Sequence, residues 1–125
     1  MPWLEFNPNP KRKRTGDCAI RAVAAALDVS WDDSYILLCL QGLADKDLPN
    51  TDAGWGAVLE QHGFRRGLVE ADCQRCYTLR DFAIEHPHGT FVVSTHEHVI
   101  CVRDGSWWDT WDSADERPIY YFHKE

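Results

Sequence analysis

Long hydrophobic runs and a surplus of positive charge are both missing from this sequence. No stretch of its 125 residues approaches the roughly 18 consecutive apolar residues of a membrane-spanning helix, so we expect no membrane partner. Acidic residues outnumber basic ones by 20 to 13, giving a net charge of -7, and nucleic acid is not an expected partner because phosphate binding needs a basic face. The first residues lack the basic-then-apolar order of a signal peptide, which predicts a cytoplasmic protein.

Cysteines are few and odd in number. The chain has five, and without a secretory context this count argues against a disulfide framework and predicts reduced thiols. Cys73 and Cys76 form a CxxC motif, but it does not open a helix after a strand as a thioredoxin site does. No second CxxC or His-x-His group stands at zinc-ribbon spacing either. We therefore expect neither a bound metal nor a cofactor.

The composition is that of a globular chain. Hydrophobic residues make up 44% of it and there are six tryptophans, whereas a disordered chain would be depleted in both. We find no internal repeat and no low-complexity stretch, and we expect a single domain over residues 1–125. Residues 1–10 contain Asn-Pro twice and predict an extended arm, which a short basic loop at residues 11–14 follows.

Residues 14–27 carry a turn signal that runs directly into an alanine-rich helix, and Cys18 stands at the junction. Asp17 is a favourable N-cap, and we expect its carboxylate to accept a backbone N–H from the first turn. The Cys18 sulfur then lies at the positive end of the helix dipole, which stabilises a thiolate over a thiol. An apolar stripe predicts that this helix is the central buried one: Ile20, Val23, Ala24 and Leu27.

Capping and stop signals predict three further helices. They run from Ser30 to about Leu40 with a stop at Gly42, from Ala53 to His62 with Asp52 as the cap, and from Thr78 to Glu85 before Pro87. Candidate strands lie at residues 64–70, 91–93, 99–102, 107–111 and 118–122, the last four separated by turn residues. This order predicts an α+β fold with helices first and an antiparallel meander second.

Two residues of the strand-like region complete a candidate catalytic set with Cys18. His98 opens the second strand of the meander and Asp109 lies inside the third. Nucleophilic catalysis by cysteine needs an activated thiolate, a base within hydrogen-bond reach and a group that orients the base. His96 is the alternative base. Asp112 is the alternative acid, but we expect it in the following turn, where Asp is a common first residue.

Four segments carry a resemblance to a known family: residues 15–22, 89–90, 98–99 and 109–113. They are similar to small single-domain members of the papain-like cysteine peptidase superfamily, many of which are encoded by phages or prophages. The resemblance implies a papain-like fold, with the nucleophile helix packed on a C-terminal antiparallel β-sheet. It also implies a thiol protease that hydrolyses peptide or isopeptide bonds in a protein or peptide substrate. Cys18 matches the nucleophile that forms the acyl-enzyme, His98 the general base and Asp109 the orienting acid.

The oxyanion hole is where the chain departs from that family. Papain-like enzymes at large have a glutamine shortly before the nucleophile, and this chain has Arg12 there. The backbone N–H of Cys18 is the remaining donor to a developing oxyanion, and Asn7, Asn9 or Thr15 is the candidate second donor.

Two alternative functions stay open at the level of sequence. The same triad is suited to other acyl or amide chemistry, such as deamidation or transglutamination, which differs only in what leaves and what attacks. The other alternative is a non-catalytic protein-binding module on a papain-like scaffold. An exposed cluster of Trp107, Trp108 and Trp111 would favour this module, because tryptophan is enriched at binding hot spots.

Overall fold

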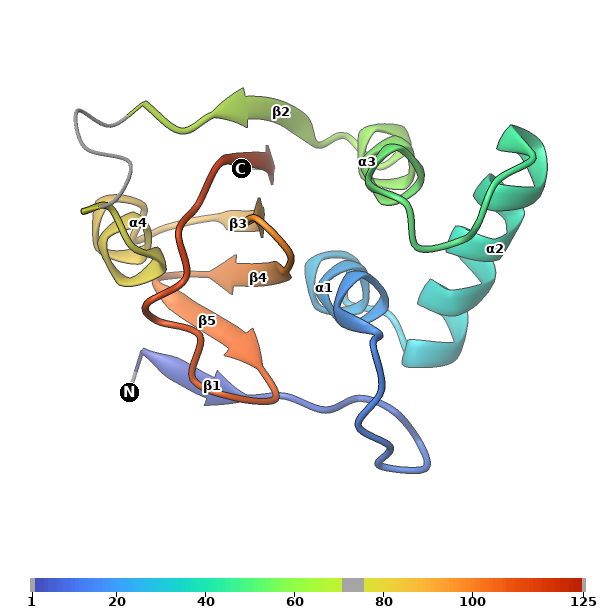
Figure 1. Cartoon of the computed structure of the whole chain (residues 1–125), viewed down its shortest axis with the longest axis horizontal. Coiled ribbons are helices and arrows are strands. Elements are labelled where there is room, and N and C mark those ends of the chain that lie inside the picture. Colours follow the sequence, from blue (N-terminus) through green and yellow to red (C-terminus); the bar gives the residue numbers. More distant parts are fainter. Residues whose placement is uncertain (1, 71–75, 125) are drawn as a thin grey trace.

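The computed structural model describes residues 2–70 and 76–124 of the chain. Within these residues there are four helices and six strands, an α+β arrangement (Figure 1). The helices are α1 (Cys18–Leu27), α2 (Trp31–Asp45), α3 (Asp52–Gln61) and α4 (Leu79–Glu85). The strands are β1 (Trp3–Glu5), β2 (Arg65–Leu68), β3 (Thr90–Ser94), β4 (Val99–Arg103), β5 (Ser106–Asp109) and β6 (Tyr120–Lys124).

The six strands form one sheet in the order β1-β5-β4-β3-β6-β2. Strands β3, β4 and β5 are successive antiparallel neighbours, as the predicted meander requires. The prediction is wrong for β6, which pairs with β3 on the opposite side, because the ten residues between β5 and β6 are long enough to return across the sheet. The N-terminal arm adds β1 parallel to β5, so the sheet is mixed rather than purely antiparallel.

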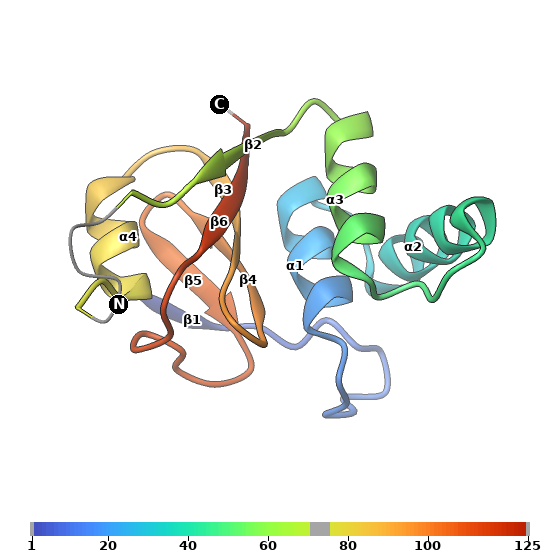
Figure 2. The same cartoon turned by 45° about the horizontal axis from the view of Figure 1, so that its top comes forward.

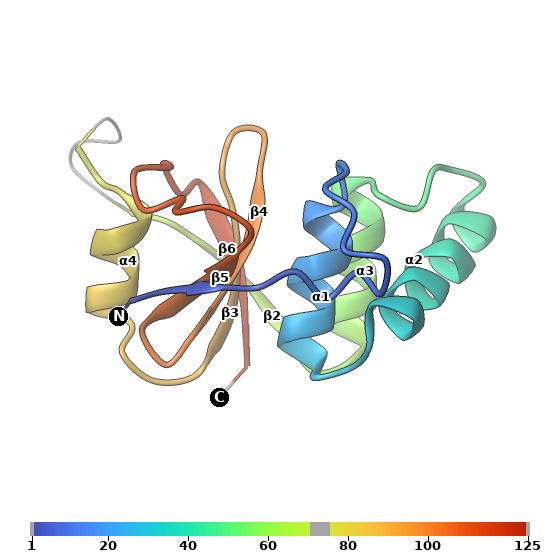
Figure 3. The ribbon, with the colours of Figure 1, turned by 90° about the horizontal axis from the view of Figure 1, so that it is seen from below.

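Helices cover both faces of the sheet (Figure 2). Helix α1 packs on one face with α2 and α3 beyond it, whereas α4 covers the other (Figure 3). Successive side chains of a strand point to opposite faces, so Cys101 enters the α1 core and its neighbours Ile100 and Val102 enter the α4 core. The central strands are therefore buried on both faces, and β4 lies directly against α1.

Helix α1 has the predicted bounds and is the central buried helix, but its cap differs from the prediction. Asp17 is the N-cap residue by backbone position, yet its carboxylate makes no capping hydrogen bond. It binds the Arg21 guanidinium and accepts a hydrogen bond from Trp31 Nε1 at 2.9 Å. The expected cap is wrong because a buried cation one turn further along the helix competes for the same carboxylate.

The ends of α2 and α3 also correct the predictions. Helix α2 continues past Gly42 to Asp45. Gly42 lies inside the helix, at the point where the loop that follows the helix packs closely against it. A Cβ there would lie 2.8 Å from the Asp47 carbonyl oxygen. Thr51, not Asp52, caps α3 by accepting a hydrogen bond from the backbone N–H of Gly54 at 3.0 Å. In helix α4 the predicted capping box at Thr78 is confirmed.

The thiols are not all reduced. Cys76 is disulfide-bonded, so the expectation of reduced thiols is wrong for this residue, because an odd count excludes only the pairing of every cysteine. Cys18, Cys39 and Cys101 are free, and Cys73 lies outside the described residues. None of the helices in the described ranges has both the length and the apolar character needed to cross a bilayer.

Candidate active site

Three elements that are distant in the sequence meet at the N-terminal end of α1. Cys18 is the first residue of α1, His98 immediately precedes β4, and Asp109 is the last residue of β5. The β3–β4 turn lies beside the start of α1 (Figure 1). A cleft of about 330 Å³ opens there, lined by residues of α1, of the α3 N-terminus and of that turn: Gly16, Cys18, Ala19, Asn50, Asp52, Trp55 and residues 94–99.

The Cys18 thiol is hydrogen-bonded to His98 and to the backbone N–H of Val99. Burial by itself raises the pKa of the thiol. The two hydrogen bonds and the nearby positive charges of His98 and Arg21 outweigh this effect and hold the pKa of Cys18 below its ordinary value. The thiolate form of Cys18 is therefore easier to reach than that of an ordinary cysteine. By contrast, burial raises the pKa of Cys101 to about 12, so that thiol stays protonated.

The His98 ring bridges the thiol and a buried acid. Its Nε2 lies 2.6 Å from Oδ2 of Asp109, which leaves Nδ1 for Cys18. Burial lowers the pKa of His98, but the hydrogen bonds to Asp109 and Cys18 and their negative charges raise it to about 9. Burial raises the pKa of Asp109, while the bond to His98 and that ring's charge reverse the shift and hold it low. Imidazolium and carboxylate are the favoured forms.

The Asp109 carboxylate is fixed by further donors. Ser113 Oγ donates to Oδ2 at 2.7 Å, and the backbone N–H of Thr110 donates to Oδ1 at 2.8 Å. Arg21 Nη2 donates to the same Oδ1 at 3.2 Å. Since every oxygen has a partner and the residue is only 1% exposed, the acid has one available orientation toward His98.

The alternative base and acid lie elsewhere in the local structure. His96 is exposed in the turn before β4, where it lines the cleft without a hydrogen bond to Cys18 among the described contacts. Asp112 Oδ1 accepts hydrogen bonds from Trp107 Nε1 at 2.9 Å and from the Ala114 backbone at 3.2 Å. The Asp112 carboxylate thus stabilises the turn after β5, as an Asp at this position is expected to do.

Arg21 and Asp17 belong to the site although the sequence analysis did not assign them to it. Arg21 is 6% exposed and Asp17 is 3% exposed, and the guanidinium joins the carboxylates of Asp17 and Asp109. A buried ionic row therefore runs from Asp17 through Arg21, Asp109 and His98 to Cys18, with alternating charges. The sequence signal was an Asp–Arg pair four residues apart in a helix that is otherwise apolar.

The oxyanion-hole candidates differ in their access to the cleft. Neither Thr15 nor Asn9 is among the residues that line it, and Asn9 Oδ1 accepts the backbone N–H of Lys11 at 2.8 Å in a local turn. The backbone N–H of Cys18 has no acceptor within the part of the chain that the structure describes, because the first N–H groups of a helix have no carbonyl partner inside the helix. Asn50, which the sequence analysis did not consider, also lines the cleft with its side-chain amide unpaired among the described residues.

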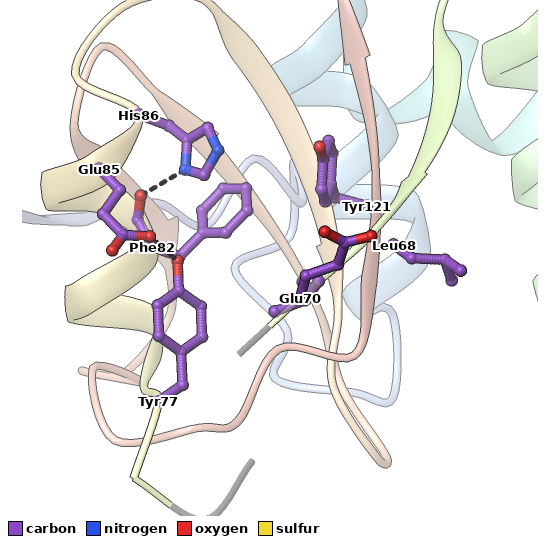
Figure 4. A pocket seen from close by; sticks show the side chains of 8 residues that line it. Leu68, Glu70, Tyr77, Phe82, Glu85, His86 and Tyr121 are labelled. Carbon is purple, nitrogen blue, oxygen red and sulfur yellow. Dashed lines mark hydrogen bonds between the residues drawn. The ribbon is translucent and has the colours of Figure 1, made fainter. Parts of the chain in front are cut away.

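A second cavity, of about 200 Å³, lies between α4 and the β2 end of the sheet (Figure 4). Two hydrogen bonds lie among its lining residues: Tyr77 donates its hydroxyl to Glu85 at 2.5 Å, and His86 Nδ1 lies 2.8 Å from the Phe82 carbonyl oxygen. Burial and the Glu85 carboxylate raise the pKa of Tyr77 above its ordinary range. Among residues 2–70 and 76–124 no group of three or more His, Cys, Asp or Glu side chains is arranged to hold a metal ion.

Comparison of the chain with protein-family models, with curated proteins and with solved structures finds no match. The function of the site therefore has to follow from its own geometry and electrostatics.

Proposed function

We propose that this chain is a papain-like cysteine hydrolase that cleaves peptide or isopeptide bonds through an acyl-enzyme on Cys18. The observation that carries the proposal is the continuous contact from the Cys18 thiol through His98 to the buried Asp109 carboxylate. A lowered thiol pKa beside a raised imidazole pKa favours a thiolate–imidazolium ion pair near neutral pH. This is the activated nucleophile that acyl transfer needs.

Acylation uses each member of the triad once. The Cys18 thiolate attacks the substrate carbonyl carbon, and the carbonyl π electrons move to the oxygen. The tetrahedral intermediate then collapses: the C–N bond breaks, and imidazolium Nδ1 gives its proton to the departing nitrogen. The amine leaves and a thioester remains on Cys18. Asp109 stays ionised and holds the ring in position throughout.

Deacylation regenerates the ion pair. Neutral His98 takes a proton from a water molecule, whose oxygen attacks the thioester carbonyl carbon. The C–S bond breaks, the acid product leaves, and the thiolate and imidazolium are restored. In both steps the charge that develops on the carbonyl oxygen needs hydrogen-bond donors. The free N–H of Cys18 and the Asn50 amide are two donors that line the cleft.

Thiol reactivity tests the activated nucleophile. A brief treatment with iodoacetamide at slightly acidic pH, followed by peptide mass spectrometry, compares Cys18 with Cys39, a free thiol in α2 that is also half-buried. We expect Cys18 to be carbamidomethylated much faster, and His98→Ala to remove the difference. Equal rates at the two cysteines in the unmodified protein would contradict the proposal.

Product analysis separates hydrolysis from other chemistry on the same triad. Incubation with a fluorogenic peptide library is expected to release new amino termini, and Cys18→Ala is expected to abolish the release. Ammonia released from glutamine side chains without peptide cleavage would identify a deamidase instead. Amine incorporation would identify a transglutaminase.

The non-catalytic binding module has less support in the structure. Trp107 is buried in the α4 core, and Trp108 packs against Phe6 at a ring separation of 5.3 Å. Trp111 is exposed and lies 5.1 Å from the His98 ring, so it borders the triad. The three tryptophans thus do not form the exposed cluster that this alternative requires.

A further inference from the structure

Helix α2 has an apolar face that the fold leaves uncovered. Ile36, Leu40 and Leu43 are spaced by four and three residues, so they form one stripe along the helix. The buried contacts of α2 come from the opposite side, through Ser34, Leu38 and Gly42, so the stripe points away from the protein. Helix α2 is also the element farthest from the sheet (Figures 1 and 3).

The stripe continues into the loop that follows the helix. Leu48 lies beyond the C-terminus of α2 and lines a shallow hollow of about 420 Å³ together with Gly42 and Leu43. The hollow joins Leu48 to the Leu43 end of the stripe, and four large aliphatic side chains in this part of the chain are between 54% and 67% exposed: Ile36, Leu40, Leu43 and Leu48. We call these four residues the α2 stripe. Grouped apolar side chains of this size are typical of interaction surfaces, whereas single exposed ones are ordinary.

Negative charge is concentrated in the part of the chain that carries the α2 stripe. Residues 28–60 contain seven acidic residues and one lysine, so they account for six of the seven net negative charges of the chain. All seven acids are exposed: Asp28, Asp32, Asp33, Asp45, Asp47, Asp52 and Glu60. Asp32 and Asp33 flank the start of α2, and Asp45 and Asp47 flank its end, so the stripe is acidic at both ends.

This charge pattern indicates which kind of partner binds the α2 stripe. A second copy of the chain bound through the same face would bring its acidic ends against those of the first, with Lys46 as the only nearby base within residues 28–60. Such like-charge contacts oppose association. A segment with apolar side chains between lysines or arginines fills the stripe and neutralises its ends. We infer that the α2 stripe docks a basic amphipathic helix of another protein.

This docking surface shares no residue with the Cys18 cleft. The inference therefore stands or falls independently of the proposed hydrolase activity, and its test needs no substrate.

A pair of synthetic helical peptides tests the inference on the full chain. Both carry leucines at the spacing of the stripe, and their remaining positions are lysine in one peptide and glutamate in the other. With fluorescence anisotropy, we expect the lysine peptide to bind, the glutamate peptide not to bind, and added salt to weaken the complex. Equal affinity for both peptides would overturn the inference.

Variants locate the binding face. We expect Leu40→Gln/Leu43→Gln to weaken binding of the lysine peptide by about tenfold or more, since both side chains are central and exposed. Leu68→Gln/Ile84→Gln is the matched control, because these residues are equally exposed but lie away from α2, and it should bind like the unmodified chain.

Two further measurements guard against a fold defect and a wrong occupant. Asp45→Asn/Asp47→Asn leaves the leucines in place and is expected to reduce both the affinity and its salt dependence. Retained binding in both α2 double variants would refute the proposed face. Sedimentation that shows a dimer abolished by Leu40→Gln/Leu43→Gln, with no peptide binding, would assign the face to a second copy instead.

Discussion

Replacing Arg21 by methionine tests whether the buried ionic row holds the protein together at the site. The change removes the cation between Asp17 and Asp109 and keeps a side chain of similar length. Both carboxylates are almost fully buried, so each would lose a charged partner without gaining access to water. Breaking a buried pair in this way costs about 3–5 kcal/mol.

Urea unfolding followed by tryptophan fluorescence measures this cost. For a denaturant dependence of about 2 kcal/mol per molar, the expected loss lowers the midpoint by roughly 1.5–2.5 M. Asp17→Asn added to Arg21→Met should recover part of the loss, since it removes the buried carboxylate that has lost its cation, whereas Asp109 still contacts His98.

Arg80→Met is the matched control for this variant. Arg80 pairs with Asp115 at 3.5 Å, but the two side chains are 52% and 88% exposed. An ion pair in water contributes about 1 kcal/mol at most, so the midpoint should barely change. If Arg21→Met shifts the midpoint no more than Arg80→Met does, the buried row is not a stabilising unit and the reasoning is refuted.

Three other changes have expected outcomes. Asp109→Ala should lower turnover by a large factor and leave the nucleophilic thiol open to alkylation, whereas Asp112→Ala should keep turnover and cost about 1 kcal/mol of stability; the opposite ranking would overturn the triad. The pKa of His98 is raised to about 9 in the folded chain, so its stabilisation is complete below the unfolded value of 6.5 and is lost as pH rises through 9. The free energy of unfolding in urea should therefore differ most between the unmodified chain and His98→Gln at low pH, and a difference that does not change with pH would contradict this. Gly42→Ala should destabilise the chain in thermal unfolding despite the helix preference of alanine, because its Cβ would lie 2.8 Å from the Asp47 carbonyl oxygen; a raised midpoint would show that the loop yields.

The sequence by itself determined the elements whose signals are local. Helix α1 follows from the alanine-rich run after Cys18, and α4 begins where its capping box at Thr78 predicts, because these signals act over three or four residues. The strands after residue 89 likewise follow from short apolar runs that are separated by turn residues. The residue types and their order were also sufficient to nominate Cys18, His98 and Asp109 as neighbours, though not to show what else surrounds them.

The tertiary structure alone decided the partners that come from distant parts of the chain. Asp17 reads locally as a helix cap, but Arg21 takes its carboxylate and reaches Asp109, which lies 88 residues further along the chain. Asn50 enters the cleft only because α3 packs beside α1. The sequence also did not predict that β6 pairs with β3, since strand order depends on which faces are buried together. Local patterns fix backbone conformation over a few residues, whereas burial of charge and apolar surface is settled only when the elements pack, and that packing made one ionic row from three separate segments.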